Sequence, residues 1–227
     1  MRRRKPTQAE LYEAYDRYAE EVRELIKKET NRIALAGFDE LNVIRTKTIT
    51  TRLYERVDRL NRRRYRELCE DVALWVYWQY DLEPPKRDWT KVVNERLREY
   101  DPVTQYVYER ELELKRLMLE EAVLTAREKG DRNALNDALK LAANLLLTQS
   151  LQGGLDLMGE TEQEAFAEAA RELGLDEDEA FVQYHACNDS RTCGECKEDD
   201  GKIFPVNGAP SIPRHYRCRC WYTRVIV

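Results

Sequence analysis

Apolar residues recur at helical spacing through most of the chain up to Gly174, which predicts a mainly helical body. The first helix is expected to begin at the capping box Thr7-Gln8-Ala9-Glu10, where a hydroxyl and a carboxylate each satisfy a free backbone amide. It should run for about 29 residues, to a C-cap at Gly37. A second pattern, from Ile49 to Trp75, predicts a long helix that ends before Pro84-Pro85.

Aspartates mark three further helix starts. Asp88 is expected to cap a short helix, since an aspartate oxygen can accept hydrogen bonds from the first free amides. Asp101-Pro102 combines an N-cap with a proline at the first helical position, and predicts a helix that reaches Gly130. Asp131 then begins the next helix.

Two features predict that this last helical stretch is broken. Gly153-Gly154 should loosen it, because glycine weakens a helix interior. Thr161 to Glu164 forms a second capping box, so a separate helix should begin there and end at Gly174. The apolar stripes are interpreted as core, together with Cys69 and the aromatic side chains of Tyr12, Tyr15, Tyr18, Trp75, Tyr77 and Trp78.

The composition changes at Phe181. The residues from there onward hold five of the six cysteines and both histidines, and three segments rich in aromatic and β-branched residues predict strands: Phe181 to Tyr184, Lys202 to Phe204 and Cys220 to Val227. The predicted fold is therefore mainly α, a bundle of long helices with a small C-terminal β module. We divide the chain into an N-terminal helical region (1–100), a helical lead-in (101–180) and the Cys/His-rich module (181–227).

Charge is unevenly distributed along these 227 residues. The net charge is +7 from the first residue to Arg66, -14 from Glu67 to Tyr184, and +2 from His185 onward, which gives -5 for the chain. The basic first third favours contact with nucleic acid, such as double-stranded DNA, or with an acidic partner, whereas the acidic middle disfavours coating of nucleic acid by the whole chain. The candidate DNA-contacting residues are Arg2, Arg3, Arg4, Arg62, Arg63 and Arg64.

Apolar runs are short. None approaches the roughly 18 to 20 residues that a membrane span needs, so no membrane association is expected. The basic start is not followed by an apolar segment, which argues against a secretory signal.

The strongest chemical signal is a set of cysteines and one histidine in the module. Cys193-x2-Cys196 is followed, after 18 residues, by His215-x2-Cys218-x-Cys220. Two thiols separated by two residues can both bind one tetrahedrally coordinated ion, so this spacing suits a structural zinc site. Five candidates compete for four positions: either Cys218 or Cys220 completes the set beside His215, or both bind and His215 does not. A disulfide and unliganded thiols are the alternatives, and a reducing compartment disfavours the disulfide.

Catalytic interpretations of the module are weaker. A zinc deaminase needs a glutamate two residues after a histidine, but His185 is followed by Ala186 and Cys187, and Thr192 rather than proline precedes Cys193. Cys187, His215 and Asn188 have the residue types of a cysteine protease set, but any cysteine-rich segment offers trios of this kind. We therefore expect a protein that is not an enzyme.

Three blocks of the module, taken together, resemble a known family. Asp189-x-Arg191-Thr192-Cys193-x2-Cys196, then Asp200-Gly201-Lys202, then Pro213-x-His215-x2-Cys218-Arg219-Cys220, are similar to the C-terminal signature of the Mu F-like head-morphogenesis proteins, the minor capsid proteins of tailed bacteriophages. The signature covers about the last 40 residues. Asp200-Gly201 is also a hairpin-turn dipeptide. Arg219 lies between Cys218 and Cys220, so strand alternation directs it to the opposite face, and it is expected to be exposed.

The resemblance implies a minor head protein of a phage or prophage. Such a protein is made in the host cytoplasm and enters the virion, where a few copies associate with the portal protein and other head or capsid proteins at the portal vertex. It assists head assembly, DNA packaging or ejection, and needs no catalytic step. A zinc-stabilised nucleic-acid-binding module is the alternative, supported by the basic first third.

Overall fold

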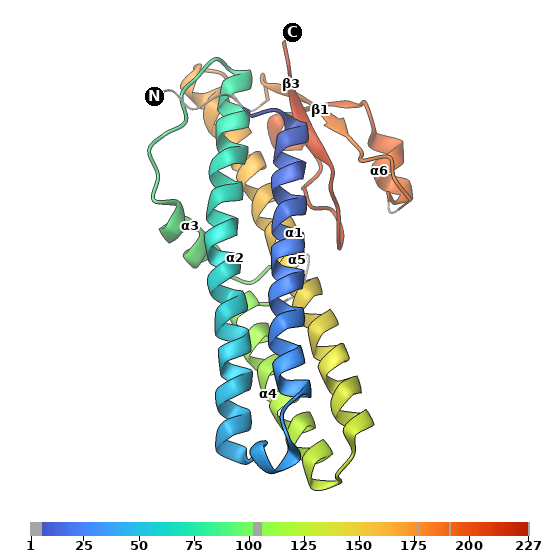
Figure 1. Ribbon diagram of the computed structural model, residues 1–227. Coiled ribbons are helices and arrows are strands. Elements are labelled where there is room, and N and C mark those ends of the chain that lie inside the picture. The colour runs from blue at the N-terminus through green and yellow to red at the C-terminus, as the bar shows by residue number, and fades with distance from the viewer. Residues whose placement is uncertain (1–5, 102–105, 177, 191, 227) are drawn as a thin grey trace. The chain divides into compact units, whose positions relative to one another are not determined.

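The computed structural model describes residues 6–101, 106–176, 178–190 and 192–226 (Figure 1). It is mainly helical with a small C-terminal sheet, as the sequence pattern predicts. The candidate DNA-contacting residues Arg2, Arg3 and Arg4 lie outside the described residues. The helices are α1 (Gln8–Ala34), α2 (Val43–Gln79), α3 (Trp89–Arg96), α4 (Tyr108–Glu128), α5 (Arg132–Glu172) and α6 (Gly194–Asp199).

The chain forms two compact units, each built from discontinuous segments. What we call the helical unit comprises Asp16–Arg64 and Asn94–Gly153, and what we call the mixed unit comprises Met1–Tyr15, Tyr65–Val93 and Gly154–Val227. Helices α1, α2 and α5 each contribute residues to both units, whereas the sequence analysis divided the chain into consecutive ranges. The C-terminal Cys/His module belongs to the mixed unit.

Three predicted helix starts are confirmed by the hydrogen bonds of their capping side chains. The Thr7 amide donates to Glu10 Oε2 (2.7 Å) and the Glu10 amide donates to Thr7 Oγ1 (3.3 Å), which is a reciprocal capping box. Asp88 Oδ1 accepts from the amide of Thr90 (3.0 Å). Asp131 Oδ1 accepts from two amides at the start of α5. These side chains satisfy free amides that a helix start leaves without partners.

One predicted helix end and one predicted helix start are wrong. Helix α1 ends at Ala34, and Gly37 has an extended conformation (φ -66°) before a short 3-10 turn, so it is not a left-handed C-cap. Asp101 does not start α4; it pairs with Tyr106 in an isolated β-bridge, and the helix begins at Tyr108. By contrast, Gly130 and Gly174 have positive φ angles, as predicted for glycines that close helices.

Helix α5 is continuous through both of the positions where a break was predicted. Gly154 is buried, and Leu155, Leu157 and Met158 are buried directly after it. Burial of these apolar side chains outweighs the cost of about 1 kcal/mol for each glycine in a helix. Thr161 is 2% exposed and lies inside the same helix, so the capping pattern there does not start a new helix.

Gly159 lies where α5 meets the segment that leads to His215. A Cβ atom at this position would stand 2.5 Å from the carbonyl oxygen of Ile212 and 2.8 Å from Cδ of Pro213. Both of these residues are buried. Glycine is therefore required for this close approach of helix and loop.

The helical unit contains a buried polar network within its apolar core. Asn61 is completely buried; its Oδ1 accepts from the Tyr18 hydroxyl (2.9 Å), and its Nδ2 donates to Ser150 Oγ (2.9 Å) and to the Tyr108 hydroxyl (2.7 Å). Ser150 Oγ in turn donates to the carbonyl of Leu146 (2.8 Å). A buried amide with its hydrogen-bonding groups satisfied fixes how α1, α2, α4 and α5 pack in this unit.

The mixed unit contains the predicted β module. Strands β1 (Phe181–His185), β2 (Ile203–Pro205) and β3 (Trp221–Val225) form an antiparallel sheet in the order β2-β1-β3. Tyr184 faces Tyr222 across the β1–β3 pair. Two helix side chains accept hydrogen bonds from β3: Glu162 of α5 from the Tyr222 amide (2.5 Å) and Gln79 of α2 from the Arg224 amide (2.8 Å).

Candidate metal centre

The Cys193-x2-Cys196 segment forms the start of the short helix α6. Cys193 is the N-cap, and its Sγ accepts a hydrogen bond from the Cys196 amide (3.4 Å). This bond directs the two sulfurs toward the same region, and Cys196 is fully buried. Gly201 follows the helix with a φ of +80°, so the predicted turn at Asp200-Gly201 is present, but it joins α6 to β2 and is not a hairpin turn between two strands. The six-residue helix itself was not predicted.

The second ligand segment is a loop that leads into β3. The Cys218 amide donates to the carbonyl of His215 (3.0 Å), and Arg217, one of the two residues between them, has a φ of +61°. This tight turn brings the His215 ring and the buried Cys218 to the same side of the loop as Cys220. Left-handed conformations are uncommon for residues other than glycine, so this backbone is held by its surroundings.

The five predicted ligand residues form two groups of three that share one cysteine. The ligand atoms of Cys193, Cys196 and His215 lie within 4.8 Å of one another, and so do those of Cys196, Cys218 and Cys220. Cys196 belongs to both groups. Its Sγ lies 3.4 Å from His215 Nε2, close to the roughly 3.5 Å expected when a sulfur and a nitrogen bind one tetrahedral zinc. The cluster can therefore hold a metal ion.

The hydrogen bond of His215 Nδ1 leaves Nε2 available to bind a metal. Its Nδ1 lies 3.0 Å from the carbonyl oxygen of Tyr216. A carbonyl can only accept, so Nδ1 carries the proton and Nε2 presents its lone pair toward Cys196. A histidine oriented through its second nitrogen is typical of metal ligands.

The size of the site suits one small cation. The cavity beside the sulfurs has a volume of about 10 Å³, which is room for a single water molecule or ion. Burial raises the pKa of Cys196 to about 11, while a hydrogen bond from the Cys220 thiol lowers the pKa of Cys218 to about 5. A bound divalent cation would deprotonate the thiols that ligate it and would compensate the charge of the resulting thiolates.

The alternative interpretations find less support in this geometry. None of the six cysteines, all within the described residues, forms a disulfide. The side chain of Asn188 donates to Asp200 (2.7 Å), and the His215 ring contacts Cys196 and Tyr216, so the trio of Cys187, His215 and Asn188 is not assembled as a catalytic set. Cys187 lines the cavity but belongs to neither ligand group.

The prediction that Arg219 is exposed is wrong. Its guanidinium forms an ion pair with Asp189, and only 20% of its side chain is exposed. The Arg219 carbonyl also accepts a hydrogen bond from the Tyr12 hydroxyl (2.7 Å). Strand alternation did not apply because β3 begins only at Trp221.

A buried carboxyl group beneath β3 was not predicted. Glu162 is fully buried, and burial raises its pKa to about 8, although the hydrogen bond from the Tyr222 amide acts in the opposite direction. Tyr12 and Tyr222 face it, and its charge contributes to raising the pKa of both phenols. At pH 7 the carboxyl is therefore expected to be neutral.

This shift predicts that the Glu162 contribution to stability is lost as pH rises. The pKa of Glu162 in the folded protein is above the unfolded value of 4.5, so its contribution to stability is complete below about pH 4.5. The contribution is lost as the pH rises toward about 8, at up to about 1.4 kcal/mol per pH unit. Glu162→Gln keeps a neutral acceptor for the Tyr222 amide and should gain stability relative to the parent between pH 5 and pH 8. Denaturant unfolding of both proteins at several pH values measures the difference, and a difference independent of pH would contradict the shift.

The described candidate DNA-contacting arginines are paired with acidic side chains. Arg62 contacts Asp58 (2.8 Å) and Glu109 (2.8 Å). Arg63 and Arg64 both contact Glu21. These carboxylates compensate the positive charge that would attract a phosphate backbone.

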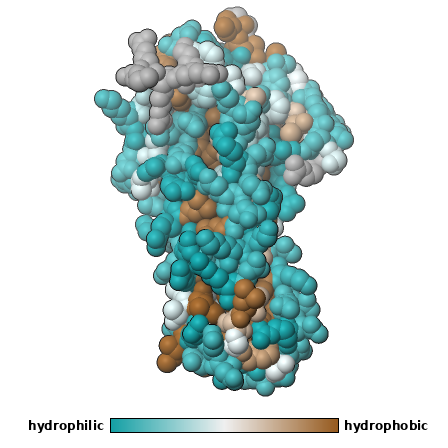
Figure 2. All heavy atoms as spheres, viewed as in Figure 1, coloured by the Kyte–Doolittle hydropathy of each residue, from teal (hydrophilic) through white to brown (hydrophobic). Residues whose placement is uncertain are grey.

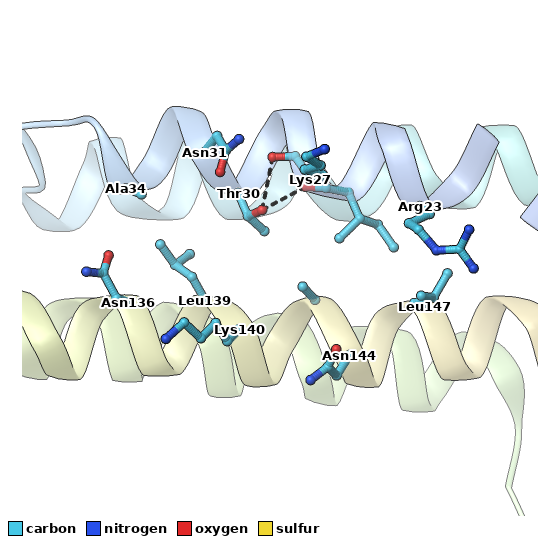
Figure 3. A pocket seen from close by; sticks show the side chains of 12 residues that line it. Arg23, Lys27, Thr30, Asn31, Ala34, Asn136, Leu139, Lys140, Asn144 and Leu147 are labelled. Atoms are coloured by element: carbon cyan, nitrogen blue, oxygen red, sulfur yellow. Dashed lines mark hydrogen bonds between the residues drawn. The ribbon is translucent and has the colours of Figure 1, made fainter. Parts of the chain in front are cut away.

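The helical unit has a separate groove between α1 and α5 (Figure 3). It has a volume of about 460 Å³, and Figure 3 shows Leu139 and Leu147 directed into it, with Thr30 hydrogen-bonded to its own helix. Its lining contains no cysteine, histidine or carboxylate. The groove therefore offers surface for contact but no metal ligands or nucleophile.

Comparison with protein-family models, with curated proteins and with solved structures found no match. None of the helices in the described parts of the chain is long and apolar enough to cross a membrane. The visible face of the molecule is mostly hydrophilic with scattered apolar side chains (Figure 2), in keeping with a charged fraction of 36%.

Proposed function

We propose that the C-terminal cluster binds one structural zinc ion and that the chain is a minor head protein of a tailed bacteriophage or prophage. The observation that carries the proposal is the convergence of the three signature blocks. Their thiols and histidine form two groups that share Cys196, and Asp200 of the middle block accepts hydrogen bonds from the Ala186 amide (2.8 Å) and from Asn188 (2.7 Å). The residues that carry the resemblance are thus the residues that hold this module together.

Zinc suits this donor set better than other common ions. Thiolates and an imidazole are the ligands that zinc prefers in closed tetrahedral sites, whereas magnesium and calcium take oxygen ligands. Cys193, Cys196 and His215 would supply three of the ligands, and Cys218 or Cys220 the fourth. The ion would stabilise a module whose three short strands offer little core of their own.

The helical unit is the part of this protein that we assign to portal binding. On α4, Leu114, Leu117 and Met118 share one face at helical spacing and are 48%, 46% and 58% exposed. Such a row of apolar side chains suits the contact of one protein with another. Association in a few copies at the portal vertex requires only binding, so the proposal includes no catalytic step.

Co-purification with the portal protein encoded in the same phage or prophage tests this function. The chain should co-elute with portal oligomers in size-exclusion chromatography, and mass spectrometry of purified particles should find it at low copy number relative to the major capsid protein. Met118→Glu should weaken the association by about tenfold or more, because a buried contact loses apolar area and gains an unpaired charge.

The matched control is Leu173→Glu, which places the same charge at a residue of the mixed unit that is 43% exposed. It should leave the association unchanged, and both variants should keep the parental stability because the substituted side chains are at the surface. Absence of the chain from both the portal fraction and the virion would overturn the assignment. The acidic partners of Arg62, Arg63 and Arg64 give no support to the nucleic-acid alternative, and we propose no second function.

A further inference from the structure

The hydroxyl group of Tyr184 lies against the sulfur of a proposed metal ligand. Tyr184 is in β1, where the alternation of exposed and buried residues directs Val182 and Tyr184 into the interior of the mixed unit. Its side chain is completely buried. The hydroxyl donates a hydrogen bond to Cys196 Sγ at 3.1 Å. A side chain from the middle strand of the sheet thus contacts the one cysteine shared by both ligand groups.

The direction of this hydrogen bond is set by the chemistry of the two groups. A phenol with an ordinary pKa near 10 keeps its proton at neutral pH and can donate it. A metal-bound thiolate has no proton but retains lone pairs, so it accepts. A hydrogen bond to a charged acceptor is roughly twice as strong as one between neutral groups, and the dry surroundings strengthen it further.

The ring of Tyr184 is held in place on several sides. It packs edge to face against Tyr222 with ring centres 5.6 Å apart. The guanidinium of Arg214 lies 5.8 Å from the ring centre and is itself held by Asp199 at 2.6 Å. The hydroxyl is therefore fixed before a metal binds and loses little conformational freedom on binding.

We propose that Tyr184 is a positioning residue of the metal centre: its hydroxyl orients the sulfur of Cys196 and stabilises the thiolate in the metal-bound state. The inference rests on the metal binding proposed above and adds a residue outside the ligand set. Partners of this kind, which contact a ligand rather than the metal, typically contribute 10-fold to 100-fold to metal affinity.

Tyr184→Phe tests the hydroxyl alone, because phenylalanine keeps the ring and its packing. Cobalt(II) serves as a spectroscopic probe for zinc in thiolate sites, and competition with a chelator gives the affinity of the full-length protein for each metal. We expect Tyr184→Phe to bind one equivalent of metal about 10-fold more weakly than the parent. The thiolate-to-cobalt charge-transfer band should move to lower energy, because the lone pairs of Cys196 lose the hydrogen bond that stabilises them.

Tyr222→Phe is the matched control. Tyr222 is a buried tyrosine of the same aromatic group, but its hydroxyl donates to the carbonyl of Pro210 rather than to a thiol. It should leave the charge-transfer band in place. A Tyr184→Phe protein with parental affinity and band overturns the inference, as does an affinity loss equal to that of Tyr222→Phe without a band shift. A parent protein that binds neither metal overturns the proposed zinc site and this inference with it, which separates that failure from failure of the Tyr184 role alone.

Discussion

Replacing Cys196 by serine is expected to reduce the metal content from about one zinc per chain to a small fraction of that value. Cys196 belongs to both ligand groups, so neither the set with His215 nor the set with Cys218 and Cys220 survives its loss. Serine keeps the size of the side chain but binds zinc poorly, because its hydroxyl is hard to deprotonate. Elemental analysis after dialysis against a chelator measures the effect.

The same variant should lose the folded module and keep most of its helical signal. Helices α1 to α5 contain none of the ligand residues, so circular dichroism should change little, while proteolysis should cleave the chain after Ala180. Cys187→Ser is the control, because Cys187 lines the same cavity without belonging to a ligand group. Full metal content in Cys196→Ser, or its loss in Cys187→Ser, would show that the ligand set is assigned incorrectly.

Gly159→Ala is expected to destabilise the protein by about 1 to 3 kcal/mol or more, despite the better helix propensity of alanine. The added Cβ would meet the Ile212 carbonyl oxygen at 2.5 Å, and neither the helix nor the buried loop can move without losing contacts. Any movement of the loop also shifts His215, three residues further on. Metal affinity should therefore fall together with stability.

Gly37→Ala provides the comparison for this substitution. At Gly37 the nearest heavy atom to a new Cβ is 3.9 Å away and the backbone is extended, so alanine should change the stability by less than about 1 kcal/mol. Denaturant unfolding monitored by circular dichroism gives both values. Equal stabilities of the two variants would show that the loop accommodates the methyl group.

Three helix starts could be predicted because their determinants are local. The hydrogen bonds of Thr7 with Glu10, and of Asp88 and Asp131 with nearby amides, connect groups two or three residues apart. The same Thr-x-x-Glu pattern at Thr161 does not start a helix, since burial of that stretch of α5 keeps it within one continuous helix. Sequence spacing cannot distinguish these cases when packing by distant residues decides the outcome.

The candidate site was predictable in its ligands and not in its surroundings. The spacing of Cys193, Cys196 and the His215 segment indicated that the two groups can share one ion, and the structure brings them together. No local pattern relates Tyr184 to Cys196 or Glu162 to Tyr222, because the first contact depends on α6 packing against β1 and the second on α5 passing beneath β3. Contacts of this kind arise only from the tertiary arrangement.

The hydrogen bonds that Glu162 and Gln79 accept from β3 also determine whether another strand can pair with this edge of the sheet. Strand β3 is at one edge, and its Tyr222 and Arg224 amides are directed away from β1 toward these two side chains. An edge strand with free amides is a template for another strand, whether from a second copy or from a misfolded chain. Because helix side chains occupy these two donors, this edge is closed to strand addition. The module is thereby protected at this edge against pairing with strands of other chains.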